Sequence, residues 1–247
     1  MANGQARLAF SLRTIRALLR DLAGFARDPA PPPAQLQWGR TFALAFMVLC
    51  VVDFALSFGG FLIWWGADAA GYEAPDLLDL DMSSAEEWVS VALLAPVLEE
   101  AVFRGWLSGR QAALELAGRM ALAITLLIAG AVLVRSGSSL ESVRIIQFGA
   151  LGFAAYALLV WFRQRKRKVE IPAWFDRNYR HLVWGSSVAF GTIHLLNYDG
   201  LTGPIDLVLV LPQTLGGLVL AYTRTRLGLA AAVAQHALFN IVLTAAG

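Results

Sequence analysis

The sequence is poor in charged residues and has almost no cysteine. Only 15% of its 247 residues are Asp, Glu, Lys or Arg and 57% are hydrophobic, so the chain is too apolar for a soluble domain of this size. The net charge of +2 is small, and the basic residues cluster between apolar runs, which gives no reason to expect a nucleic-acid partner. The single cysteine, Cys50, excludes an intrachain disulfide and a cysteine-based metal framework. These absences leave a polytopic membrane protein.

Two further features are missing from the pattern of the chain. Residues 1–40 lack the basic start, the uninterrupted apolar core and the cleavage site of a signal peptide, so this segment is expected to stay on the mature protein. No internal repeat relates one half of the chain to the other. The sequence therefore predicts a cytoplasmic or interfacial amphipathic segment over 1–40 and one transmembrane domain over 41–247.

The first forty residues carry an amphipathic helical pattern. The apolar residues that recur at helical spacing are Leu8, Leu12, Ile15, Leu19 and Leu22, and the arginines that lie mostly opposite them are Arg13, Arg16, Arg20 and Arg27. The pattern is typical of a helix that lies on an anionic membrane surface, and a cytoplasmic helix packed on the rest of the chain fits it equally well. The proline-rich run DPAPPP, residues 28–33, ends the helix.

Seven apolar runs are long enough, or nearly so, to cross a bilayer as helices. They cover residues 41–65, 88–107, 118–134, 145–162, 183–198, 202–223 and 227–246. The expected fold is all-α, a polytopic membrane helix bundle of about seven transmembrane helices plus the N-terminal amphipathic helix. With the N-terminus in the cytoplasm, only Arg135 and Arg144 of the 20 Lys and Arg fall outside. We therefore expect an integral, multi-pass protein with a cytoplasmic N-terminus, located in a bacterial inner membrane.

Three of the runs carry ionisable side chains, which are costly inside a bilayer and mark functional sites. These side chains stand in EEAVFR (99–104), FGTIH (190–194) and HALFN (236–240). With a rise of about 1.5 Å per residue and a hydrocarbon core about 30 Å thick, Glu99, His194 and His236 all fall near the bilayer midplane. The three helices are therefore expected to contribute to one site.

Spacing within the helices predicts a role for each group. Glu100 and Arg104 are four residues apart and predict a neutralising ion pair, whereas Glu99 points about 100° away and is expected to face the cavity. His236 and Asn240 share one helix face. A carboxylate, two imidazoles and an amide at one level suit the attack of water on a peptide carbonyl. One glutamate and two histidines also suit a zinc site with an open position, and the residues alone leave both mechanisms open.

In this order on separate apolar runs, the three motifs resemble the EExxxR, FxxxH and HxxxN motifs of the CPBP family. That family includes the type II CAAX prenyl endopeptidases and the bacteriocin-processing or self-immunity proteins, and the resemblance covers about residues 88–245. It implies an intramembrane endopeptidase of the CAAX-protease kind, historically labelled a metalloendopeptidase. Such an enzyme would hydrolyse peptide bonds of membrane-associated or lipidated proteins or peptides with a glutamate-activated water.

The resemblance also assigns roles to residues. The catalytic residues would be Glu99, which activates the water, His194, which positions it, and His236 with Asn240, which stabilise the oxyanion. The supporting pair would be Glu100 and Arg104. A mechanism without a cofactor is favoured, and a zinc ion bound by Glu99, His194 and His236 is the alternative.

Two other function classes fit part of the pattern. Glutamate and histidine at the midplane also serve transporters and proton relays, which predict inverted repeats and matched helix breaks. Gly216 and Gly217 interrupt the sixth run, yet they have no counterpart in the other half of the chain. A catalytically silent scaffold or immunity protein is the third possibility. The partners expected for a protease are a peptide or membrane-protein substrate and the lipid bilayer.

Four residues outside these roles are expected to be structural. Phe190 and Phe239 stand beside the motif histidines and are expected to pack rather than react. Asp53 and Asp206 lie in other apolar runs with no motif around them, so each is expected to pair helices or to form a polar lining.

Overall fold

The computed structural model describes residues 2–31, 35–72, 75–76, 85, 88–135, 139–201 and 203–246. Over these residues the regular structure is helical and includes no β-strand, which confirms the all-α prediction. Contacts between residues divide the chain into two compact units: Met1–Leu107 together with Asn178–Gly247, and Ser108–Arg177. The candidate residues all belong to the first unit.

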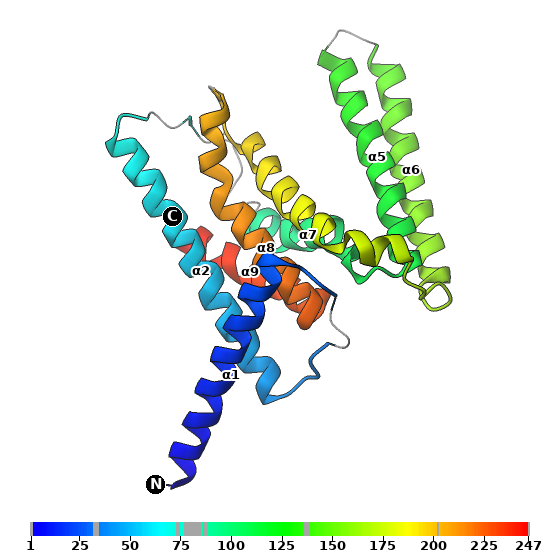
Figure 1. The fold of residues 1–247 in the computed structure, drawn as a ribbon. Helices are drawn as coiled ribbons and strands as arrows, with labels where there is room; N and C mark the ends of the chain where they lie inside the picture. Colours follow the sequence, from blue (N-terminus) through cyan, green and yellow to red (C-terminus); the bar gives the residue numbers. More distant parts are fainter. Residues whose placement is uncertain are drawn as a thin grey trace. The chain divides into compact units, whose positions relative to one another are not determined.

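The first unit is built from helices of very different length (Figure 1). The long helices are α1 (Ala2–Arg27), α2 (Arg40–Ala69), α8 (Leu211–Arg226) and α9 (Leu229–Ala246). Most of α7 (Ala173–Ile193), from Asn178 on, also belongs to this unit. The short segments are η1 (Trp88–Leu94), α4 (Ala95–Phe103), the start of η2 (Gly105–Ser108), η3 (His194–Asn197) and η4 (Pro204–Val210). The short segments carry or adjoin much of the site described below.

Helix α8 is the centre of this unit, because its residues 216–225 are all buried. It packs against α2 and α9, and α9 also packs against α4 and η1. Helix α2 buries only one face, which includes Leu49, Asp53 and Gly60, while apolar side chains such as Val51 and Leu62 are exposed on its other sides. An apolar helix with an exposed apolar surface is what a lipid environment requires.

The end of α1 is attached to α8 by polar and aromatic contacts. Asp21 accepts hydrogen bonds from the Tyr222 hydroxyl at 2.7 Å and from Arg226 Nε at 2.8 Å. Phe25 is buried and meets the Tyr222 ring edge to face, with 5.3 Å between ring centres. The helical pattern predicted for the N-terminus is therefore confirmed, and its last turns pack on the rest of the unit. Leu12 and Leu19 are exposed, and contact of this helix with a membrane surface remains a prediction.

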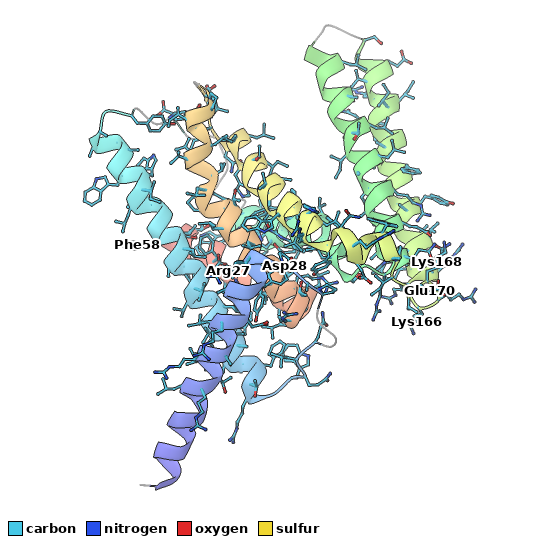
Figure 2. All side chains as sticks on the ribbon, viewed as in Figure 1. Arg27, Asp28, Phe58, Lys166, Lys168 and Glu170 are labelled. Carbon is cyan, nitrogen blue, oxygen red and sulfur yellow. The ribbon has the colours of Figure 1, made fainter. Side chains whose placement is uncertain are left out.

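The second unit is a helical hairpin in which α5 (Gln111–Arg135) and α6 (Leu140–Gln164) run side by side (Figure 1). Lys166, Lys168 and Glu170 lie together at the turn after α6 (Figure 2). Lys168 Nζ donates to Glu115 at 2.6 Å, and this hydrogen bond, with a second from Arg119, holds the pKa of the Glu115 carboxyl below its usual range. This ion pair ties the turn to the first helix of the hairpin.

Each of the seven predicted runs corresponds to helical structure, with one clear difference in position. Among the described residues, those long and apolar enough to cross a membrane are Arg40–Ala69, Val143–Gln164 and Pro204–Arg226, and Leu229–Ala245 is apolar but shorter. The run predicted at 183–198 is helical from Ala173 to Ile193, because the polar residues 176–181 hide its first turns from hydropathy. His194 therefore follows α7 in a tighter turn instead of lying within the helix. The count of seven spans and the side of the N-terminus remain predictions.

Two adjacent glycines of α2 allow the packing of α2 on α8 to be tested. A Cβ on Gly60 would lie 3.0 Å from the Pro212 Cβ and nearer still to its Cγ, whereas a Cβ on Gly59 would meet nothing within 4 Å. The proline ring cannot rotate away, so Gly60→Ala is expected to destabilise the protein by about 1–3 kcal/mol. Gly59→Ala is the matched control and is expected to be neutral or stabilising by up to about 1 kcal/mol. Thermal unfolding in detergent measures both, and equal midpoints would contradict the packing.

Candidate active site

The first motif stands on α4, whose entry is shaped by a proline. The wide π-helical turn η1 leads into α4, and Pro96 lies in the first turn of α4. In the π-helical register the Val91 carbonyl faces the nitrogen five residues on, which belongs to Pro96 and carries no hydrogen. Asn240 supplies the missing donor, with its Nδ2 2.8 Å from the Val91 oxygen. One N–H of the Asn240 amide thus holds the start of the helix that carries the motif glutamates.

Glu100 and Arg104 form the ion pair that the sequence predicts. Arg104 Nη1 donates to Glu100 Oε1 at 2.6 Å, and both side chains are 0% exposed. Arg104 also lies over the Phe190 ring, with 3.9 Å from its guanidinium carbon to the ring centre. The guanidinium is therefore held by a carboxylate and by the face of an aromatic ring, which are the two partners that a buried cation prefers.

His236 lies beside both motif glutamates. Its Nδ1 is 3.0 Å from Glu100 Oε1, and its Nε2 is 3.7 Å from Glu99 Oε2. A carboxylate engaged by Arg104 only accepts hydrogen bonds, so His236 Nδ1 is the donor and Glu100 fixes the orientation of the ring. Glu99 Oε2 is buried and has no hydrogen-bond partner among the described residues. Glu100 Oε2 is also buried without a hydrogen-bond partner among the described residues, so the two glutamates differ in that Glu100, and not Glu99, pairs with Arg104.

Phe190 connects the second motif with the other two. Its ring meets His194 and His236 edge to face, with ring centres 4.8 and 5.6 Å away. His194 Nδ1 lies 2.7 Å from the Phe190 carbonyl, which only accepts, so this nitrogen carries the proton and a neutral His194 offers the lone pair of Nε2. The packing role predicted for Phe190 is confirmed. Phe239 also packs, since it stacks on Phe54 of α2 with 5.0 Å between ring centres.

The two glycines of α8 are explained by close approach rather than by a break in the helix. A Cβ on Gly217 would lie 2.9 Å from Arg104 Nη2 and 3.0 Å from the Phe190 ring. A Cβ on Gly216 would lie 3.0 Å from Asp53 Oδ1. Helix α8 is continuous through both residues, so the glycines make room for the buried charged groups on either side of it.

Two residues that hold the end of α4 were not identified from the sequence as part of the site. Arg224 Nε donates to the Arg104 carbonyl at 3.1 Å, and Ser186 Oγ donates to the Phe103 carbonyl at 2.6 Å. These carbonyls lie at the end of a helix, where α-helical donors run out, and the Arg104 carbonyl also accepts from the Leu107 N–H of the next turn at 3.1 Å. Arg224 lies one residue beyond the predicted apolar run 202–223, whereas the structure makes it a buried residue of α8. The only signal was an arginine between two threonines at the end of an apolar run.

A cavity of about 810 Å³ opens beside the motif histidines. Its lining includes His194, His236 and Asn240 together with one face of α2, and Glu99 is not among the lining residues. The expectation that Glu99 faces the cavity directly is therefore not met within the described part of the chain. His236 connects Glu99 with the cavity, because it lines the cavity and lies beside Glu99.

The two aspartates outside the motifs hold elements together, as predicted. Asp53 Oδ2 accepts from Gln235 Nε2 at 2.9 Å, and Gln235 Oε1 accepts from Thr223 at 2.7 Å, so a buried chain of polar groups joins α2, α9 and α8. Asp53 also lines the cavity. Asp206 accepts from the Tyr72 hydroxyl and from the Gly203 backbone N–H, and it fixes the start of η4.

Comparison with known proteins identifies the family. The model of the family described as Type II CAAX prenyl endopeptidase Rce1-like matches residues 82–176 and 167–242. The chain belongs to this family. No curated protein and no solved structure matches the chain.

The Rce1-like match includes all three motifs. It therefore covers the motif residues that meet around His236 and Phe190, which are Glu99, Glu100, Arg104, His194 and Asn240. It confirms the resemblance inferred from the motifs, and it identifies the chain as a membrane protein of an endopeptidase family. The match begins after α2, so the α2 wall of the cavity comes from outside the matched region.

The predicted zinc ligands do not form a three-ligand set in the described part of this Rce1-like chain. Glu99 and His236 are close enough to share an ion, but no group of three His, Cys, Asp or Glu side chains among the described residues is arranged to hold one. His194 donates its Nδ1–H to a backbone carbonyl and keeps Nε2 free, which is also the arrangement of metal-binding histidines. Zinc binding by Glu99, His194 and His236 therefore stays a prediction.

The buried ion pair gives a test of the site's construction. Glu100→Gln leaves Arg104 buried without its counter-charge, so it is expected to destabilise the protein by about 3–5 kcal/mol. Adding Arg104→Met removes the uncompensated cation, and the double variant is expected to be more stable than Glu100→Gln alone. Thermal unfolding of the three purified proteins measures the effect. A single variant as stable as the wild type would contradict the proposed pairing.

Proposed function

We propose that this protein is an intramembrane endopeptidase in which Glu99 activates a water molecule for attack on a peptide bond of a membrane-associated or lipidated substrate. The observation that carries the proposal is that Glu99 pairs with no arginine or lysine among the described residues, while its buried Oε2, which has no hydrogen-bond partner there, lies 3.7 Å from His236 Nε2. The neighbouring carboxylate of Glu100 is already neutralised by Arg104. Glu99 is therefore the motif carboxylate that can take a proton from water.

The reaction needs a base, a route for the proton and a group that positions the water. Glu99 removes a proton from the water, and the oxygen of the water bonds to the carbonyl carbon of the substrate. His194 accepts a hydrogen bond from the same water through Nε2, because its Nδ1–H is committed to the Phe190 carbonyl. When the C–N bond breaks, Glu99 returns the proton to the leaving amine nitrogen. Atoms and protons then balance without a covalent enzyme intermediate.

The oxyanion formed on the carbonyl oxygen needs donors that are fixed in advance. Asn240 and His236 share a face of α9 and both line the cavity. One N–H of Asn240 is used on the Val91 carbonyl, and the second N–H of the same amide is the donor for the oxyanion. His236 adds a second donor as the imidazolium, which gives its Nδ1–H to Glu100 and its Nε2–H to the oxyanion.

The cavity is of the size and character that a substrate segment requires. Its volume of about 810 Å³ lies within the range of small-molecule and cofactor sites, about 300–1,000 Å³. Apolar and aromatic side chains form most of the wall, and the polar groups include the motif residues. The carbonyls of a helical segment are already hydrogen-bonded, so the substrate must unwind or present an extended end before attack.

A comparison of protein N-termini in living membranes tests the proposed function. Membranes from cells that produce the wild type are compared with those from cells that produce Glu99→Gln at matched expression. New N-termini are expected only with the wild type, because loss of the base lowers the rate by about 100-fold or more. Glu141→Gln makes the same chemical change at an exposed residue of α6 and is expected to behave as the wild type. Identical N-termini from folded wild type and Glu99→Gln would contradict the proposal.

A further inference from the structure

Apart from two histidines, the ionisable side chains in the described part of the cavity wall are mainly acidic. Among the described lining residues, the charged ones are Asp53 and Asp76, and none is lysine or arginine. The three carboxylates of Glu99, Glu100 and Asp53 lie in this region with two guanidinium groups. Arg104 pairs with Glu100, and the buried Arg224 donates to backbone carbonyls. The balance around the cavity is therefore negative, which favours a ligand that carries a positive charge.

Asp53 is held rigidly where such a ligand would meet it. Gln235, the residue before His236, donates to Asp53 Oδ2 at 2.9 Å, and Thr223 fixes that amide from the other side. Gly216 leaves room for the other oxygen, since a Cβ there would lie 3.0 Å from Asp53 Oδ1. None of the ion pairs among the described residues involves Asp53. A fixed carboxylate that forms no ion pair among the described residues is suited to bind a cation in a partly enclosed cavity.

The surface next to Asp53 suits the long apolar stem of a basic side chain. Phe54, Phe58, Phe61 and Trp64 lie along one side of α2 and line the same cavity; Phe58 is marked in Figure 2. Aromatic faces attract ammonium and guanidinium groups, and the stem of lysine or arginine packs well on apolar rings. This wall lies outside the region that the family model matches, which begins at residue 82.

We propose that Asp53 is a specificity residue, which selects peptides carrying a lysine or arginine side chain near the bond that enters the site. That these peptides are cleaved rests on the proposed protease function, whereas the preference for a basic side chain rests on the cavity itself. The basic head group pairs with Asp53, and its stem lies along the aromatic side of α2. An acidic side chain at the same place is rejected, because it would be buried against a carboxylate.

Peptide binding to the full-length Glu99→Gln protein tests this preference without hydrolysis. The probes are fluorescent host peptides of leucine, alanine and valine in which one residue is lysine, its neutral isostere norleucine, or glutamate, moved along the peptide. At one or more positions, lysine is expected to bind about tenfold more tightly than norleucine, and glutamate more weakly than both. A protein with no lysine preference at any position would overturn the inference, and this measurement needs no change at Asp53.

The variant Asp53→Asn then tests whether Asp53 causes the preference. Asparagine can still accept from Gln235, so the readout is the ratio of the norleucine to the lysine dissociation constant, which is expected to fall to about one. Asp206→Asn neutralises another buried aspartate, which does not line the cavity, and is expected to keep the ratio at about tenfold. A ratio that Asp53→Asn leaves unchanged would assign Asp53 a structural role only.

The two proposals fail in different ways. Cleavage that depends on Glu99 without a lysine preference would overturn the inference about Asp53 and leave the protease intact. A lysine preference that depends on Asp53, in a protein whose wild type produces no new N-termini, would leave the binding site intact and overturn the protease.

Discussion

Glu100 and Arg104 bring opposite charges together at a place where both side chains are fully buried. A buried pair of this kind is costly to form and more costly to break, so its neighbours must satisfy the remaining polar surface. The neighbours here do so only in part: Phe190 covers the guanidinium and His236 donates to the carboxylate. Arg104 Nε and Nη2 and Glu100 Oε2 have no hydrogen-bond partner among the described residues. The pair therefore does more than join two turns of α4, because it sets the direction of the imidazole at the proposed reaction centre.

Several features of the fold follow from accommodating that pair. The close approach of α8 requires glycine at position 217, since any side chain would collide with Arg104 or Phe190. The short helix α4 depends on donors from outside it, which are Asn240 at its entry and Arg224 with Ser186 at its end. Motif residues thus support one another structurally, and Asn240 has a structural role beside its proposed chemical one. Loss of one such residue is expected to affect folding and activity together.

The all-helical fold and the clustering of the three motifs could be predicted because apolar runs and buried charges are local features of sequence. The four-residue spacing of Glu100 and Arg104 was sufficient to predict their pairing, since a helix places those positions on one side. The start of α7 was missed because the polar residues 176–181 lower the hydropathy of its first turns. Arg224 and Ser186 could not be predicted as partners of α4, because their contacts join residues far apart in the chain.

The wall of the cavity could not be predicted from the sequence either, because it too depends on contacts between residues far apart in the chain. Its wall combines α2 with η4, α8 and α9, and the helix–helix packing that places α2 there depends on small residues such as Gly60 rather than on a motif. Asp53 was correctly expected to pair helices or form a polar lining, and the structure shows both. The aromatic residues that follow Asp53 are visible in the sequence, but only the structure places them on the cavity wall, from which the preference for a basic side chain is inferred.

The orientation of His236 by Glu100 is the central claim, and ¹⁵N NMR of histidine-labelled protein tests it most directly. The chain has only 3 histidines, so replacing each in turn assigns the signals. We expect a proton on Nδ1 of His236, donated to Glu100, and a proton on Nδ1 of His194, donated to the Phe190 carbonyl. A His236 ring with Nδ1 unprotonated would show that Glu100 does not hold the imidazole, and the proposed geometry at Glu99 would lose its support.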